Sequence, residues 1–194
     1  MVGSLRFAVA AAFALMLTAC ASAPEYGQGP TYSGGERAAA RVLEQSWAEG
    51  ARIETPDRPL QCVTFARALS GINIHGDAGA WWDLADGHYA RGNEPQLGAV
   101  LVLTGYAGPH RGHLAVVTAM DGPRQIRVDH ANWMDDGRIY RNDPVVDVSP
   151  DNDWSEVRVW DERDHVLGSR TYLVRGFIGP GREDGDDARV ASRD

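Results

Sequence analysis

Two side chains in this sequence have the types and surroundings that nucleophilic catalysis requires. Cys62 follows Pro59 at the predicted start of a helix, where unpaired N–H groups and the helix dipole favour the nucleophilic thiolate. His113 opens an apolar strand after a Gly-rich turn, and a histidine at a strand end can face a helix N-terminus. The pair predicts a thiol hydrolase in which His113 takes the proton of Cys62.

The composition excludes several other chemistries. All 19 basic residues are arginine, so no lysine is present to serve as a Schiff base, a P-loop ligand or a general base. The net charge is −8 without a cluster of basic residues, which argues against nucleic acid as a partner. His113 is therefore the base that remains for Cys62.

A third polar segment, residues 128–133, follows on the next predicted strand, which a hairpin places beside His113. It offers a group that can orient the imidazole. Alternation along the strand puts His130 and Asn132 on one face and Asp129 on the other, so His130 or Asn132 is favoured over Asp129. The sequence leaves the choice among these three residues open.

These segments together resemble the CHAP family, the cysteine, histidine-dependent amidohydrolases and peptidases of cell-wall metabolism. The resemblance covers roughly residues 60–133 and is carried by three pairs, Gln61-Cys62, Gly112-His113 and Asn132-Trp133. The family usually has Glu at the position of His130, so this chain departs from the pattern at its third catalytic position. The resemblance implies a papain-like fold, Gln61 beside the Cys62 N–H as oxyanion donors, and neither a metal nor a cofactor.

The implied reaction is cleavage of a peptidoglycan amide through an acyl-enzyme on Cys62, by an N-acetylmuramoyl-L-alanine amidase or a stem-peptide endopeptidase. Trp133 lies next to the proposed site, and Trp81 and Trp82 are candidates to line a sugar or peptide cleft, although core packing is the commoner role of tryptophan. The sequence leaves open which bond is cut, whether a protein regulator is needed, and the oligomeric state.

Three alternatives compete with catalysis by Cys62. The unusual His130 fits a catalytically weak or inactive lipoprotein that binds peptidoglycan or a partner hydrolase. His110 and His113, with His130 or Asp129, can form a zinc site. The acidic segment after Pro150 has calcium-loop spacing without the required turn glycine, at Asp151, Asp153, Ser155 and Glu162.

The elements expected to position these residues are helices first and strands second. Apolar spacing predicts helices over residues 38–47, 62–69 and 78–85. Short β-rich runs follow at residues 99–103, 114–118, 126–128, 145–148, 157–160 and 172–178. This order predicts an α+β domain over residues 36–180, with N-terminal helices packed on an antiparallel sheet, and a disordered tail over residues 181–194.

The N-terminal segment predicts that the protein is located in the cell envelope. Arg6 precedes an eleven-residue apolar run, residues 7–17, which is typical of a signal peptide. Residues 17–20 resemble a lipobox, which implies cleavage after residue 19 and acylation of Cys20, with Ala21 pointing to the outer membrane. Residues 20–35 then form a lipidated tether, and the domain faces the periplasm while anchored to, but not crossing, the membrane.

Overall fold

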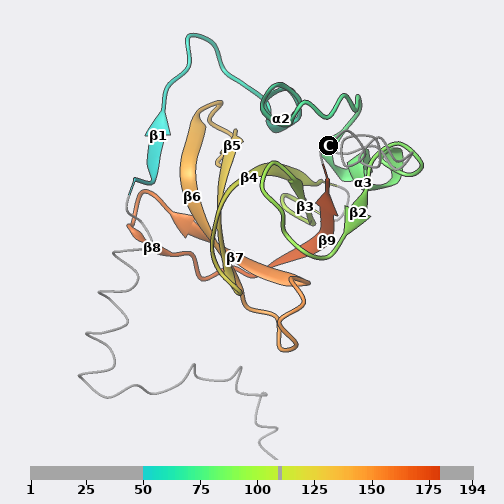
Figure 1. Cartoon of the computed structure of the whole chain (residues 1–194). Coiled ribbons are helices and arrows are strands. Elements are labelled where there is room, and N and C mark those ends of the chain that lie inside the picture. The colour runs from blue at the N-terminus through green and yellow to red at the C-terminus, as the bar shows by residue number, and fades with distance from the viewer. Residues whose placement is uncertain (1–49, 109–110, 180–194) are drawn as a thin grey trace, which may run out of the picture.

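Antiparallel strands dominate the computed structural model, which describes residues 50–108 and 111–179. Six of them pair side by side in the order β6-β5-β4-β3-β9-β7, and β7 pairs back onto β6. The sheet therefore closes into a barrel, seen end-on in Figure 1. The six strands are β3 (Val100–Thr104), β4 (His113–Gly122), β5 (Gln125–Ala131), β6 (Ile139–Asp147), β7 (Glu156–Asp161) and β9 (Tyr172–Ile178).

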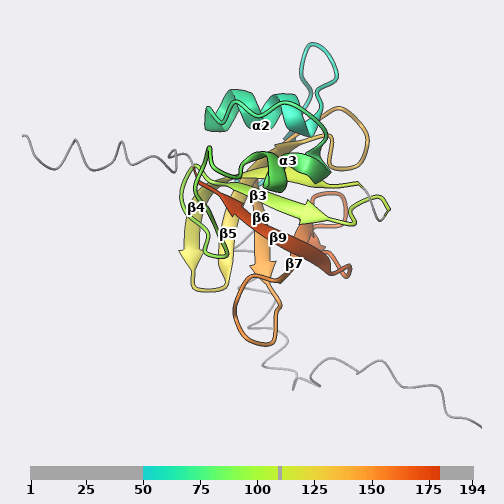
Figure 2. The ribbon, with the colours of Figure 1, turned by 90° about the vertical axis from the view of Figure 1, so that its right-hand side faces the viewer.

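The remaining described elements lie around this barrel. Short strands extend it at three places, where β1 (Arg52–Glu54) pairs with β6, β2 (Arg91–Gly92) with β9, and β8 (Val166–Leu167) with β7. Helix α2 (Cys62–Ser70), the 3-10 turn η1 (Ala78–Ala80) and helix α3 (Trp81–Leu84) complete them. Figure 2 shows α2 and α3 on the same side of the strands. Among the described residues, no helix has the length and apolar character needed to span a bilayer.

The predicted α+β class, with N-terminal helices packed on an antiparallel sheet, is wrong, because the sheet is a closed barrel. The described residues are mostly β, and their two α-helices have only nine and four residues. Each predicted strand does correspond to a barrel strand, but β6 begins at Ile139 rather than at residue 145. The added residues 139–144 pair with β5 and β1, whereas Val145 and Val146 pair with β5 and β7 at once, and register shifts between neighbouring strands bend the sheet until it closes. The predicted helix 38–47, the signal segment, the tether and the tail lie outside the described residues.

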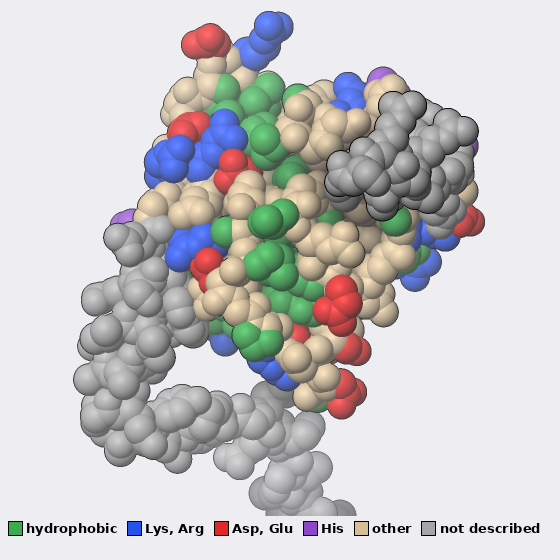
Figure 3. All heavy atoms as spheres, viewed as in Figure 1, with side chains coloured by type: hydrophobic (Ala, Val, Ile, Leu, Met, Phe, Trp, Pro, Cys, Tyr) green, Lys and Arg blue, Asp and Glu red, His purple; other side chains and the backbone are tan. Residues whose placement is uncertain are grey.

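Side chains on the two faces of the barrel wall form separate cores. On β3, Leu101 and Leu103 point into the barrel, while Val100 and Val102 point outward against the helices. The interior is filled by aliphatic and aromatic side chains that include Trp133, Trp154 and Phe177. Seen from the side of Figure 1, apolar side chains gather toward the middle of the surface and charged ones toward its edges (Figure 3).

Two glycines allow the helical segment to approach the barrel closely. A Cβ on Gly112 would lie 2.8 Å from the backbone N of Gly79 in η1, so a side chain there would push this turn away from the start of β4. A Cβ on Gly176, whose φ is +144°, would lie 2.3 Å from the ring of Trp82. The glycine that precedes His113 thus fixes the distance between the turn at residues 78–80 and the strand that carries the histidine.

Candidate active site

Cys62 is the first residue of α2 and lies between the helix and the barrel wall. Gln61 before it is extended, and its carbonyl accepts the N–H of Phe65 at 3.0 Å, which closes the first helical turn. Cys62 is a free thiol and is half-buried. Backbone N–H groups of Leu114, Val63 and Cys62 itself are directed at its sulfur. The predicted helix start is confirmed, and it places the thiol against the first turn of α2 and the start of β4.

The protonation state of Cys62 differs from the sequence-based expectation. Burial raises the pKa of the Cys62 thiol, and this effect exceeds the opposing contributions of the three N–H groups and of the charge on Arg111. The helix N-terminus therefore does not by itself hold a thiolate. The resting side chain is a neutral thiol, which requires a base in order to become a nucleophile.

His113 is the first residue of β4, and its imidazole points into the end of the barrel. Only 1% of the residue is exposed, and its ring packs against Tyr106 at 4.9 Å and Trp133 at 4.8 Å between centroids. Burial, followed by the neighbouring His130, holds the pKa of His113 well below its usual value. The imidazole is thus neutral near pH 7, the form in which it can accept a proton.

His113 heads a buried row of hydrogen bonds that crosses three strands. Its Nε2 lies 2.9 Å from Nδ1 of His130 on β5, and Nε2 of His130 lies 2.9 Å from Oδ2 of Asp143 on β6. His130 is 1% exposed and Asp143 is fully buried. Burial raises the pKa of Asp143, while the bond from His130 opposes this rise. The row gives His113 a fixed ring orientation and ends on a carboxyl group.

Asp143 is the residue of this row that sequence reasoning missed. It precedes the apolar run at residues 145–148, and we expected the strand to begin only there. In the structure β6 includes Asp143, which pairs with Val128 and points inward like Val145. An acidic residue two positions before an inward-facing valine is the signal that could have identified it.

No hydrogen bond joins Asn132 to His113 among the described residues. Strand β5 ends at Ala131, and Asn132 adopts a left-handed conformation with φ of 61°, so the alternation that pairs it with His130 stops one residue too early. Its Nδ2 instead donates to Oε1 of Gln61 at 3.1 Å, and its Oδ1 accepts the N–H of Gly137 at 2.7 Å. Asn132 is therefore placed to orient the Gln61 amide beside Cys62.

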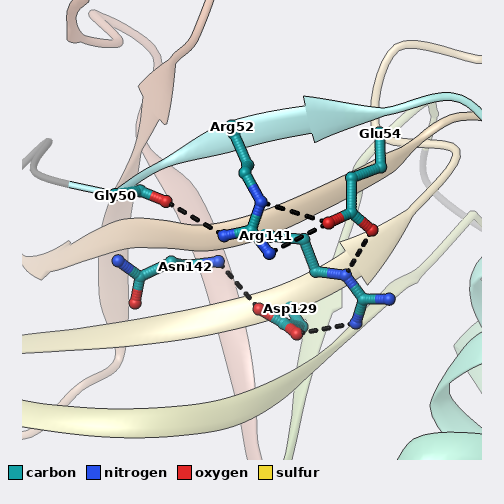
Figure 4. Close-up of polar contacts among 6 residues, drawn as sticks. All are labelled: Gly50, Arg52, Glu54, Asp129, Arg141 and Asn142. Carbon is teal, nitrogen blue, oxygen red and sulfur yellow. Dashed lines mark hydrogen bonds and ion pairs between the residues drawn. The ribbon is translucent and has the colours of Figure 1, made fainter.

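Asp129 lies on the outer face of β5, as alternation along the strand predicts. Its carboxylate pairs with Arg141 at 2.8 Å and accepts the N–H of Asn142 at 2.7 Å. Arg141 also pairs with Glu54 on β1 at 2.9 Å, so the group forms a surface network (Figure 4). Asp129 is committed to this network and faces away from His113.

The three tryptophans have different surroundings. Trp133 is buried against His113 and against His130, whose ring centroid lies 5.1 Å from its own. Trp81 is fully buried in the core between the helices and the barrel, and Trp82 packs against Arg91 at 5.1 Å. Neither Trp81 nor Trp82 lines a cavity at Cys62, so their role in substrate binding stays a prediction without geometric support.

Two cavities of about 390 and 450 Å³ meet at Cys62. Both are lined by Gln61, Cys62, Arg111 and Gly112. The larger one also reaches His113 and a rim that contains Asn132, Asp135, Tyr106, Tyr172 and Arg170. The thiol is thus open to a substrate that extends in two directions, with the imidazole on one side.

In the part of the chain that the structure describes, no cluster of possible ligands supports the zinc or the calcium alternative. No group of three or more His, Cys, Asp or Glu side chains converges there for a metal ion. His110 lies outside the described residues, so the zinc hypothesis is not tested with its full set. In the calcium-like segment, Asp153 accepts the Ser155 N–H at 3.0 Å and the Ser155 hydroxyl at 2.6 Å, which closes a local turn.

Comparison with known proteins gives one match. No curated protein and no solved structure matches this chain. The sequence pattern of a known domain, in contrast, aligns with the segment from the last residue of β1 to the residue that follows β5. This segment contains Cys62, His113, His130 and Asn132 and stops before Asp143. The family whose model matches residues 54–132 is the CHAP domain.

Proposed function

We propose that this protein is a cell-envelope thiol hydrolase that cleaves amide bonds in peptidoglycan through an acyl-enzyme on Cys62. The observation that carries the proposal is the hydrogen-bonded row from His113 through His130 to Asp143, whose first residue lines the same cavity as the half-buried thiol of Cys62. The CHAP match over residues 54–132 supports a hydrolase of the peptidoglycan type. Together they favour catalysis over binding alone.

The row supports an inference about which nitrogen of His113 would act as the base. An ionised Asp143 accepts a hydrogen bond from Nε2–H of His130 at 2.9 Å. The other ring nitrogen of neutral His130, Nδ1, is then a hydrogen-bond acceptor. That atom then accepts Nε2–H of His113, also at 2.9 Å. The proton-free atom of His113 is consequently Nδ1, and we infer that this nitrogen serves Cys62.

Catalysis then proceeds in two halves. Nδ1 of His113 takes the thiol proton as the sulfur of Cys62 attacks the amide carbonyl, and the imidazolium returns this proton to the leaving amine as the C–N bond breaks. Water, activated by the same nitrogen, hydrolyses the thioester and regenerates the thiol. Because the Cys62 pKa is raised, proton transfer accompanies attack instead of preceding it.

The oxyanion of the tetrahedral intermediate would be stabilised by the Cys62 backbone N–H and the Gln61 side-chain amide. The bond from Asn132 to Oε1 of Gln61 supports this role, because an amide whose oxygen is engaged presents its NH₂ group elsewhere. Gln61 is exposed and lines both cavities, so its amide is within the space that a substrate would occupy.

A weak or inactive binding protein is the second candidate, and the observation that favours it is His130 at the position where the CHAP family usually has Glu. The raised pKa of Cys62 predicts slow reaction with thiol probes at pH 6, as expected of an unactivated cysteine. Labelling rate at that pH therefore does not separate the two candidates. Turnover of a substrate does, because only the hydrolase releases products.

The test is digestion of purified sacculi by the wild-type protein and by Cys62→Ala. We expect the wild type to release soluble muropeptides and the variant to release none above the buffer blank. Mass spectrometry of the new termini distinguishes an amidase, which frees the stem-peptide N-terminus, from an endopeptidase, which cuts within the stem. Equal release by the two proteins would contradict the mechanism.

We further propose an outer-membrane lipoprotein that faces the periplasm and is anchored through acylated Cys20. The support is the lipobox-like segment at residues 17–20 and the apolar run before it. Cys20→Ser expressed in a Gram-negative host is expected to lose incorporation of labelled palmitate and to leave the membrane fraction. Palmitate incorporation by the variant would contradict the anchor.

A further inference from the structure

The two cavities at Cys62 differ in whether His113 lines them, and this difference would set the direction in which a substrate binds across the thiol. His113 lines the larger cavity, of about 450 Å³, and is not among the residues that line the smaller one. The smaller cavity is instead bounded by the turn at residues 76–79 and by Val63. The cleft is therefore asymmetric about the thiol.

This asymmetry orients the amide, if the protein is the hydrolase proposed above. The leaving amine must receive its proton from His113, so the amine fragment has to lie on the His113 side of the sulfur. The acyl fragment, which stays bonded to Cys62 in the thioester, then occupies the smaller cavity. Each cavity is thereby matched to one half of the substrate.

The larger cavity carries unneutralised positive charge. Arg111 and Arg170 line it, and within the described ranges neither forms an ion pair with a carboxylate. Arg170 is held over the ring of Tyr172 at 4.6 Å, and its guanidinium donates to the Gly105 carbonyl at 2.9 Å. The whole chain has a net charge of −8, so two arginines without an ion-pair partner at one cavity are unexpected from the composition.

The other polar residues of this cavity offset that charge only in part. Asp135 is its one acidic residue among those described, and one of its oxygens accepts a bond from Asn132 at 3.4 Å. Burial raises the pKa of Tyr106 to about 12, so its hydroxyl stays protonated and adds no negative charge. The balance is two cations against one anion.

We propose that the larger cavity is the leaving-group subsite and that it selects an amine fragment bearing a free carboxylate, which Arg170 binds with Arg111 beside it. A guanidinium matches a carboxylate with two parallel N–H bonds, and the Tyr172 ring keeps the Arg170 fork in place. Selection at this site deepens the proposed function, because stem-peptide fragments on the amine side of a cut carry such carboxylates.

The experiment uses one pool of muropeptides, released from sacculi by a muramidase and divided into two portions. One portion keeps its carboxylates, and in the other they are converted to carboxamides with carbodiimide and ammonia. Binding of each portion to full-length Cys62→Ala is measured by calorimetry, and cleavage of each by the wild type is followed by chromatography. Arg170→Gln is the test variant, and Arg175→Gln is the matched control, since Arg175 is exposed on β9 and pairs with Asp83 at 3.7 Å.

We expect the free-acid portion to bind and react at least about tenfold better than the amidated one, the size of one charge-assisted contact. Arg170→Gln should remove this preference mainly through KM, Arg175→Gln should retain it, and Asp135→Asn should strengthen it. Equal use of both portions by the wild type, or an unchanged preference in Arg170→Gln, would overturn the subsite. Preferential binding by Cys62→Ala without any cleavage by the wild type would uphold the subsite and reject the hydrolase.

Discussion

Two polar groups on opposite faces of β5 and β6 both contain carboxyl groups but pair them with different side chains. On the outer face Asp129 pairs with Arg141, which pairs with Glu54, and each of these carboxylates meets an arginine near water. On the inner face Asp143 meets only His130, and its second oxygen, Oδ1, has no partner among the described residues. The outer group is electrostatically satisfied, whereas the inner one is not.

This difference indicates where the molecule gives up stability. Because burial raises the pKa of Asp143, its ionised form is less favourable in the folded state than in the unfolded chain. The stabilising contribution of the protonated carboxyl is complete below its usual pKa near 3.8 and is lost as pH rises through the higher folded-state value. A buried carboxyl that costs stability at neutral pH is typical of a functional position.

The largest effect is expected from the first residue of the inner row. His113→Gln removes the proposed base while keeping a polar side chain of similar length, and we expect hydrolysis of sacculi to fall about a thousandfold or more. His88→Gln, at an exposed histidine away from both cavities at Cys62, is the control and should retain full activity. Activity of His113→Gln within a few-fold of the wild type would exclude His113 as the base.

The next effect concerns the last residue of the row. Asp143→Asn can either accept from His130 or donate to it, so it no longer imposes one tautomer on His113, and we expect kcat to fall about a hundredfold. The free energy of unfolding at pH 7 should be equal or higher, because the variant lacks the buried charge. Loss of activity accompanied by an equal loss of stability would mean that Asp143 is only structural.

A smaller effect is expected at Asn132, which contacts the proposed oxyanion donor Gln61. Asn132→Asp keeps the acceptor for Gly137 but presents an oxygen to Oε1 of Gln61, so the Gln61 amide should turn over and kcat should fall about tenfold. The double variant Gln61→Ala/Asn132→Asp should then lose no more of its kcat than Gln61→Ala alone. Fully additive losses in this double-mutant cycle would break the link between the two side chains.

The smallest effect is expected from a substitution on the outer face. Asp129→Asn is the matched counterpart of Asp143→Asn. Asp129→Asn keeps the acceptor for the Asn142 N–H and loses the ion pair with Arg141. Activity should stay within about twofold, and stability should fall by about 1 kcal/mol or less, with the difference shrinking at high salt. A large loss of activity would show that the two faces are coupled.

Local patterns predicted much of the site. The start of α2 at Cys62, the strand that begins at His113 and the inward side of His130 follow from punctuation and from the two-residue period of strands. These features depend only on neighbours along the chain. The contrast between Asp129 and His130 was predictable for the same reason.

The remaining features depend on residues distant in sequence. Closure of the barrel needs β6 to pair with both β5 and β7, and no local pattern encodes that pairing. Asp143 joins the site only through that longer strand, and Asn132 leaves the predicted face because the strand ends at Ala131. The pKa of Cys62 also depends on tertiary burial, which outweighs the helix N-terminus that the sequence does reveal.

The central claim is that Asp143, acting through His130, leaves Nδ1 of His113 free to take the Cys62 proton. Long-range ¹H–¹⁵N NMR of the imidazole nitrogens at neutral pH tests it directly. We predict that His113 is neutral with its proton on Nε2, that Nδ1 of His130 accepts the hydrogen bond from this proton, and that Asp143→Asn gives His113 a mixture of tautomers. A wild-type His113 protonated on Nδ1, or on both nitrogens, would contradict this account.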